Sequence, residues 1–251
     1  MIELRELRSG YAGREVLHGI SLQFRPGEVL VIAGPNGCGK STLLRAAAGI
    51  GEVSGGEVLI DGVSSAALSA RQIAQKCAYM PQDRPAPSLS VRRMALHGRF
   101  PYLSYPRRYR AEDFAAVEAA LERARALDIA DRAIPELSGG QRQRAYLAMA
   151  LAQETETLLM DEPTAFLDIS HQLSVMEMAS SLARDGRAVV MVLHDLCLAL
   201  RRADRLAVIS GGVLLAQGTP EEIYASGVID EAFQARLRRA ETPDGPQYYF
   251  A

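Results

Sequence analysis

The residues from Gly34 to Thr42 have the types and spacing needed to bind a polyphosphate. Glycine tolerates positive φ, so the backbone of such a loop can turn several N–H groups inward toward phosphate oxygens. Lys40 adds a full charge beside the β and γ phosphates, and the Ser41 hydroxyl suits Mg²⁺. The apolar run 29–33 precedes the loop and a helix-like run follows it, so a helix dipole would add to the attraction. The predicted nucleotide-binding residues are Gly34, Pro35, Asn36, Gly37, Cys38, Gly39, Lys40, Ser41 and Thr42.

Two adjacent carboxylates end a second apolar run, Thr157-Leu158-Leu159-Met160. Side chains alternate along a strand, so Asp161 and Glu162 are expected to point apart and to do different work.

A second anion-binding segment, Leu137-Ser138-Gly139-Gly140-Gln141, comes before another helix-like run. The first N–H groups and the dipole of that helix would favour an anion. One chain already has its phosphate loop, so a neighbouring copy best explains the second anion site.

Along the chain the phosphate loop comes first, segment 137–141 second and the carboxylate pair last. These three motifs in that order resemble the nucleotide-binding subunit of ATP-binding cassette (ABC) transporters, and the resemblance covers nearly the whole chain. The segment Ile169-Ser170-His171-Gln172 looks like the ATPases of ferric siderophore, haem and cobalamin importers. The resemblance implies a Mg²⁺-dependent ATPase with ATP and Mg²⁺ as cofactors. A P-loop small-molecule kinase would not explain the second anion-binding segment.

The resemblance also implies roles for single residues. Asp161 would hold Mg²⁺ through water, and Glu162 would polarise the water that attacks the γ-phosphate. Gln82 matches the glutamine that reaches Mg²⁺ and the attacking water, and His194 matches the histidine that contacts the γ-phosphate. Tyr11 occupies the position of the ring that stacks on adenine.

In this family a head-to-tail pair holds two ATP molecules between its subunits. The residues Ser138, Gly139, Gly140 and Gln141 of one copy would close over the γ-phosphate bound by the other. The segment Thr164-Ala165-Phe166-Leu167-Asp168 corresponds to the loop between the two sites, with Asp168 as its acid. Ala165 stands where relatives often have Ser or Asn, so a cross-subunit hydrogen bond from that side chain is absent.

The implied partners are a second copy of the chain and two integral membrane permease subunits, with an extracytoplasmic binding protein acting indirectly. Such a complex would take up an iron chelate, haem or cobalamin, with the ATPase on the cytoplasmic face of the membrane. The alternatives are an ABC ATPase for another cargo, or a soluble one in DNA repair or translation. Those soluble proteins usually have tandem cassettes or long coiled coils, and this chain has neither.

The elements that must position these residues follow an α/β order. The resemblance implies a P-loop NTPase with a RecA-like core, an antiparallel β flank and an inserted α-helical subdomain. One domain, 1–251, would comprise a nucleotide-binding core (1–87 and 153–251) and a helical subdomain (88–152). The pattern predicts strands at 2–11, 15–24, 57–60, 77–80, 157–161, 188–193, 205–210 and 213–217. It predicts helices at 68–75 and 112–126, and one that begins at 219. A turn is expected at 54–56 and a loose tail at 240–251.

Composition narrows the class of protein further. The 251 residues suffice for one globular unit, and 48% hydrophobic content with a net charge of −2 is typical of a soluble protein. No apolar run approaches the roughly 20 residues of a membrane helix, and the N-terminus alternates charges where a signal peptide would be apolar. Three separated cysteines without metal-ligand spacing fit a reducing cytosol.

The stretch 84–110 is rich in arginine and aromatic residues and has no acid. It could be a solvated face, or a contact with permease loops or anionic lipid headgroups. Nucleic acid is a third interpretation, but the overall charge and the acids at Glu112 and Asp113 argue against it.

Overall fold

The computed structural model describes residues 1–83, 85–165, 167–243 and 245–251. Arg84 of the basic stretch, Phe166 of segment 164–168 and Asp244 of the predicted tail therefore lie outside the description. A six-stranded sheet has the order β10-β9-β3-β8-β7-β6. The strands β3, β6, β7, β8 and β9 are parallel, and β10 is antiparallel to β9. Their bounds are Val29–Ala33 (β3), Cys77–Met80 (β6), Thr157–Asp161 (β7), Ala188–Val192 (β8), Arg205–Ser210 (β9) and Val213–Gly218 (β10).

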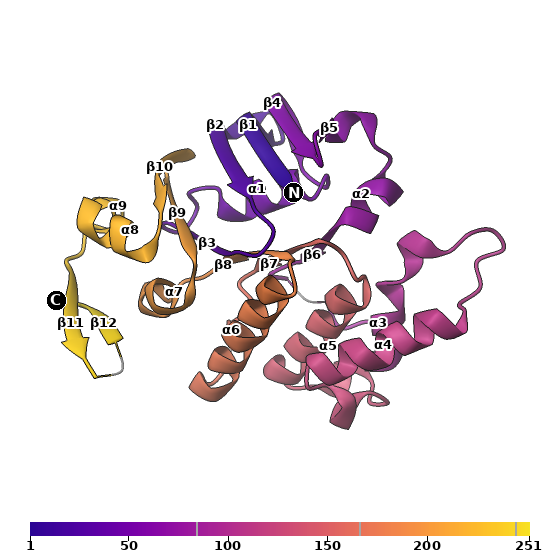
Figure 1. Cartoon of the computed structure of the whole chain (residues 1–251). Coiled ribbons are helices and arrows are strands. Elements are labelled where there is room, and N and C mark those ends of the chain that lie inside the picture. The colour runs from indigo at the N-terminus through magenta and orange to yellow at the C-terminus, as the bar shows by residue number, and fades with distance from the viewer. Residues whose placement is uncertain (84, 166, 244) are drawn as a thin grey trace.

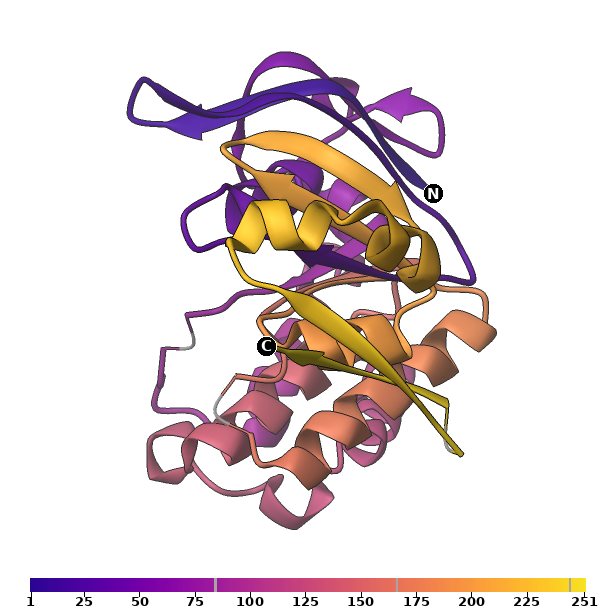
Figure 2. The same cartoon turned by 90° about the vertical axis from the view of Figure 1, so that its left-hand side faces the viewer.

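Both faces of this sheet are covered, which is why its central strands are continuous apolar runs. Alternate residues of β3 join two separate hydrophobic clusters: Leu30 and Ile32 face one, and Val29 and Val31 face the other. Helix α1 (Lys40–Ala47) packs into the first cluster, and α5 (Gly139–Ala152), α6 (Ile169–Arg184) and α7 (Leu196–Arg202) into the second. Figures 1 and 2 show these layers one above another.

A second sheet covers α1 from the other side (Figure 1). It has the order β2-β1-β4-β5, with antiparallel pairs throughout. Its strands are β1 (Ile2–Tyr11), β2 (Arg14–Phe24), β4 (Glu52–Ile60) and β5 (Val63–Ser64). The predicted antiparallel pair at the N-terminus is confirmed, but it belongs to a sheet of its own.

The predicted turn at 54–56 is wrong, because these residues lie inside β4. Here β1 and β4 change register between Arg5 and Arg8, and both Glu6 and Gly56 have positive φ. A Cβ at Gly56 would overlap the carbonyl oxygens of Arg5 and Glu6. The glycine therefore permits a close approach of two strands at a bulge, a contact that the local sequence does not reveal.

Helices gather below the main sheet in Figure 1. The helices α3 (Val91–His97) and α4 (Ala111–Arg123) pack against α5, together with the short 3₁₀ turns Phe100–Tyr102, Leu127–Ile129 and Ile134–Glu136. Helix α2 (Ala70–Lys76) precedes β6. The helices predicted near 68–75 and 112–126 are confirmed as α2 and α4. No helix in the described ranges has the length and apolar composition needed to cross a bilayer.

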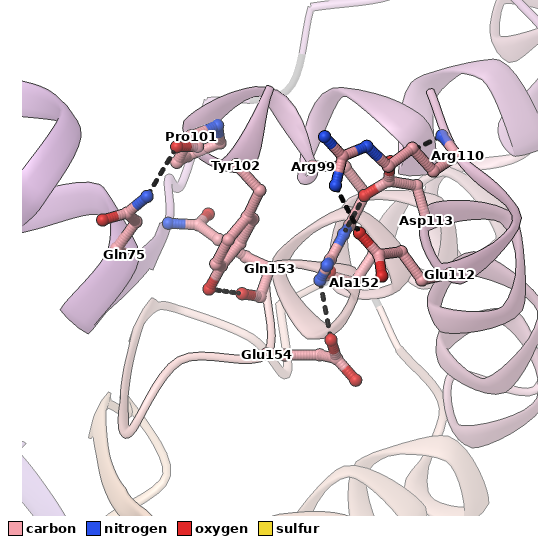
Figure 3. Close-up of polar contacts among 10 residues, drawn as sticks. All are labelled: Gln75, Arg99, Pro101, Tyr102, Arg110, Glu112, Asp113, Ala152, Gln153 and Glu154. Atoms are coloured by element: carbon pink, nitrogen blue, oxygen red, sulfur yellow. Dashed lines mark hydrogen bonds and ion pairs between the residues drawn. The ribbon is translucent and has the colours of Figure 1, made fainter. Parts of the chain in front are cut away.

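One arginine of the basic stretch is buried, which excludes it from a solvated face. Arg99 is 6% exposed; it donates to Asp113 Oδ1 at 3.0 Å and to Ala152 O at 2.9 Å, and Glu154 Oε2 lies 2.7 Å away. Its guanidinium also lies 4.3 Å from the ring centre of Tyr102 (Figure 3). The cluster joins α4 to the end of α5.

The predicted loose tail at 240–251 is also wrong. After α8 (Pro220–Ser226) and α9 (Val228–Phe233), the strands β11 (Leu237–Thr242) and β12 (Gly245–Phe250) form a hairpin, seen in front in Figure 2. Leu237 and Tyr248 are buried, and the Tyr248 ring meets the Tyr224 ring edge-on at 5.5 Å. The anchoring contacts lie on α8, outside the hairpin, so the tail's own sequence does not show them.

Candidate functional site

The loop 34–39 links β3 to α1 and depends on glycine at two close approaches. A Cβ at Gly34 would overlap the carbonyl oxygen of Ile209 on β9. Gly39 precedes α1 with φ 106°, and a Cβ there would lie 2.6 Å from Leu17 Cδ2. These contacts place the loop at the carboxyl end of the parallel strands, where ligands bind in open α/β sheets.

Lys40 brings a charge to the centre of this loop. It is 6% exposed, and its Nζ donates to Gly34 O at 2.7 Å and to Pro35 O at 2.8 Å. No carboxylate of the described residues forms an ion pair with it. Two carbonyls satisfy its hydrogen bonds without neutralising it, so the loop keeps a net attraction for an anion.

A pocket of about 340 Å³ opens over the loop. Gln82, Glu162 and His194 come to its wall from the ends of three parallel strands, and Tyr11, which is 62% exposed, comes from β1. Val16 of β2 also lines it and had no motif to signal it. The remaining described lining residues are Asn36, Gly37, Gly39, Lys40, Ser41 and Thr42. The predicted residues Gly34, Pro35 and Cys38 contact Lys40 Nζ instead of lining the pocket.

Asp161 lies at the end of β7 with no exposed surface. Its Oδ2 accepts a hydrogen bond from the Tyr79 hydroxyl at 3.3 Å, while its Oδ1 has no partner among the described residues. Burial raises the pKa of this carboxyl, and the Ser41 and Tyr79 hydroxyls oppose that rise.

The oxygens of Ser41, Asp161 and Gln82 fit a hard cation such as Mg²⁺, since a buried carboxylate oxygen without a partner is costly unless a cation satisfies it. Within the described ranges, no group of three His, Cys, Asp or Glu could hold a metal by itself. The cation would therefore take the rest of its ligands from phosphate and water.

Glu162 and His194 meet across the pocket. Glu162 directly follows β7 with φ 51°, and His194 follows the neighbouring strand β8. The Nε2 of His194 lies 2.6 Å from Oε1 of Glu162. The pair holds a carboxylate and an imidazole, two groups able to exchange protons, at the mouth of the phosphate loop.

The second anion-binding segment begins α5, as predicted. Ser138 caps the helix: its Oγ accepts from Gln141 N at 3.3 Å, and Gln141 Oε1 accepts from Ser138 N at 3.1 Å. Asp168 caps α6, and hydrogen bonds from His171 and Ser170 lower the pKa of its carboxyl to about 2. A separate pocket of about 640 Å³ is lined by Ser138, Gly139, Gly140, Gln141, Arg144, Leu167, Asp168 and His171.

Among the residues that the structure describes, none lines both pockets. The structure thus brings the phosphate loop together with Tyr11, Gln82, Glu162 and His194, but it keeps Ser138 and Asp168 apart from them. Arg144 and His171 were not predicted as pocket residues. Arg144 is paired with Asp128, and His171 reaches the pocket only because Asp168 fixes the first turn of α6.

Comparison with known proteins agrees with this geometry. The ABC transporter family matches residues 17–165, which contain all three motifs. The chain is 40% identical to the "Probable siderophore transport system ATP-binding protein YusV" of Bacillus subtilis (strain 168), over 96% of this chain and 89% of that protein. It is 41% identical to the hemin import ATP-binding protein HmuV of Rhodococcus jostii (strain RHA1), over 92% of this chain and 79% of that protein.

Among solved structures, the dimeric bacterial ABC transporter cassette MJ0796 superposes with a TM-score of 0.78 at 27% identity, over 88% of this chain and 99% of that one. The sequence relatives and the structural neighbour therefore point to the same family as the three motifs. The chain belongs to the ABC transporter family and is an ATP-binding subunit that hydrolyses ATP to drive transport.

Proposed function

We propose that this chain powers uptake of an iron chelate, haem or cobalamin by hydrolysing Mg²⁺-ATP between two copies of itself. The names of its relatives support the cargo class, since they describe siderophore transport and hemin import. Each pair would sit beneath two permease subunits at the cytoplasmic face of the membrane, with an extracytoplasmic binding protein delivering the cargo.

The observation that carries the proposal is the presence of two separate anion-favouring pockets on one chain. The phosphate loop offers backbone N–H groups and Lys40, and the start of α5 offers N–H groups and a helix dipole. Head-to-tail pairing would place residues 138–141 of one copy over the γ-phosphate bound by the other. Shifting such a pair from 1% closed to 99% closed requires that ligands bind the closed state better than the open state by about 5.5 kcal/mol. Two shared nucleotides can supply this difference.

In this arrangement the phosphate loop and Lys40 bind the phosphates, and the Tyr11 ring stacks on adenine. Ser41, Gln82 and Asp161 hold Mg²⁺, which neutralises charge on the β and γ oxygens when it is bound. The core, 1–87 and 153–251, thereby supplies one half of each site. The helical subdomain, 88–152, supplies the other half through Ser138.

Glu162 acts on the attacking water as a general base, and His194 holds the Glu162 carboxylate at the pocket mouth. A well-placed general base is worth about 10² to 10⁴ in rate. Asp168 keeps its negative charge at working pH, because its pKa is about 2, and it fixes the start of α6 beside the second pocket.

Fractionation of a native extract tests the transport role. We expect the chain to sediment with membranes and to co-purify with a polytopic membrane protein in detergent, because the proposed permease subunits would hold it there. The ATPase activity of that complex should rise when the cognate binding protein is added with its cargo. Co-purification with ribosomes or DNA instead would overturn the transport role.

A further inference from the structure

Asp161 is held from one side by a tyrosine on the neighbouring strand. Tyr79 of β6 pairs with Leu159 of β7, two residues before Asp161. Residues two apart on a strand face the same side of a sheet, so Tyr79 and Asp161 share the face that α1 covers. The Tyr79 hydroxyl donates to Oδ2 of Asp161 at 3.3 Å, and no described residue bonds to Oδ1.

The same hydroxyl has a second partner on α1. Arg45 lies four residues after Ser41, so both side chains lie on one face of the helix. Arg45 acts on the Tyr79 hydroxyl from α1, and this interaction raises the pKa of Arg45. A cation beside the phenol oxygen polarises its O–H bond toward Asp161. Arg45 and Tyr79 thus connect α1 to Asp161 at the end of β7.

We propose that Tyr79, supported by Arg45, is a positioning residue for the divalent cation: it fixes Asp161 so that the free Oδ1 faces the oxygen ligands beside Ser41. The inference rests on the magnesium role given above to Ser41 and Asp161. Within the described part of the chain, Tyr79 does not line the nucleotide pocket. It therefore acts on the cation only through Asp161.

A purely structural role for Tyr79 is the competing explanation, because its ring packs against the hydrophobic cluster around α1. Removing the Tyr79 hydroxyl distinguishes the two roles. Tyr79→Phe keeps the packed ring and removes only the bond to Asp161. Tyr102→Phe is the matched control, since the Tyr102 hydroxyl also donates one hydrogen bond, to Gln153 O at 2.7 Å, just after the end of α5, and not to Asp161 (Figure 3).

The test measures binding of a fluorescent, non-hydrolysable ATP analogue to the full chain, first in EDTA and then during titration with Mn²⁺. For Tyr79→Phe we expect unchanged affinity in EDTA and a half-saturating Mn²⁺ concentration raised about tenfold, the usual effect of losing a hydrogen bond to a charged group. Tyr102→Phe should match the wild type in both measurements. Arg45→Gln, at an exposed position, should raise the Mn²⁺ requirement severalfold and serves as a second test where Tyr79→Phe folds poorly.

Each result decides between the explanations. An unchanged Mn²⁺ requirement in folded Tyr79→Phe or in Arg45→Gln overturns the positioning role while leaving the proposed function intact. Equal weakening of analogue binding in EDTA and in Mn²⁺ shows a structural role for Tyr79 and also overturns the positioning role. A wild-type chain whose nucleotide affinity does not respond to Mn²⁺ would refute the magnesium role itself, and the inference with it.

Discussion

Asp161 and Glu162 are neighbours in sequence but meet different environments. Asp161 is fully buried and touches the hydroxyl of Tyr79, whereas Glu162 reaches the pocket and touches His194. Asp161 is the last residue of β7, whereas Glu162 turns out of the strand with φ 51°, and this turn separates the two carboxylates. One is therefore suited to holding a cation, and the other to handling a proton.

Asp161 is predicted to lower the stability of the chain in the absence of ligand. Burial raises the pKa of its carboxyl, so the folded chain binds this proton more tightly than the unfolded chain does. Ionisation therefore reduces stability as the pH rises above the ordinary aspartate range. Asp161→Asn should raise the melting temperature at pH 7 by about 2–4 °C, the shift expected for roughly 1 kcal/mol.

Thermal melts at pH 7 and pH 3.5 measure this effect, with and without Mg²⁺-ATP. The gain from Asp161→Asn should shrink at pH 3.5, where the wild-type carboxyl is largely protonated. Mg²⁺-ATP should stabilise the wild type more than the variant. A variant that melts below the wild type at pH 7 without ligand would contradict the account.

The gathering of Gln82, Glu162 and His194 with the phosphate loop at one pocket could be predicted from sequence, because motif residues are close in the chain or follow buried strands. Gln82, Glu162 and His194 follow β6, β7 and β8, whose carboxyl ends share one edge of the sheet. Val16 and Tyr79 could not be found in this way. Their places depend on which strands pair and in what register, and no local pattern gives that.

At the scale of elements, the Arg99 cluster (Arg99, Asp113, Ala152 and Glu154) fixes the C-terminal end of α5, whereas Ser138 caps its N-terminal end. Arg99 contacts Asp113 of α4, Ala152 at the end of α5 and Glu154 beyond it (Figure 3). The turn that follows Arg99 is tied to the core as well, since Gln75 of α2 donates to Pro101 O at 2.8 Å. The orientation of α5, and hence of Ser138, depends on these bonds.

Arg99→Ala should cost about 3–5 kcal/mol of unfolding free energy, because removing one partner leaves a buried carboxylate uncompensated. Arg92→Ala is the control: Arg92 pairs with Glu118 and Asp131 at the surface, and such pairs contribute about 0–1 kcal/mol. Urea denaturation of both variants makes the comparison. Equal losses in the two variants would argue against a structural role special to the Arg99 cluster.

The strands and helices with strong local patterns could be predicted from sequence, such as β1, α1 and β8. The errors fall where a distant contact decides the conformation. Gly56 looks like a turn residue but serves a bulge between β1 and β4. The hairpin β11–β12 looks loose but is fixed by Leu237 and by the contact between Tyr248 and Tyr224. Arg99 looks exposed in a basic stretch but is buried, and it pairs with Asp113 of α4 and with Glu154, which follows α5.

At the scale of the whole molecule, the phosphate loop and Ser138 line different pockets of one chain. The proposed function therefore requires a reaction centre built with residues from two copies. Lys40→Ala damages the phosphate loop and leaves Ser138 intact. Ser138→Asp places a negative charge where a phosphate is expected, and Asp caps the helix about as well as Ser, so α5 should stay folded.

Mixing these two variants tests the shared site most directly. Neither variant alone should hydrolyse ATP, but a mixed pair keeps one whole site, built from Lys40 of one copy and Ser138 of the other. In an equal mixture, random pairing makes about half of the pairs mixed, and each mixed pair keeps one of its two sites. The expected ATPase activity is therefore on the order of a quarter of the wild-type value. If the mixture shows only the summed activities of the separate variants, the site is not shared between copies.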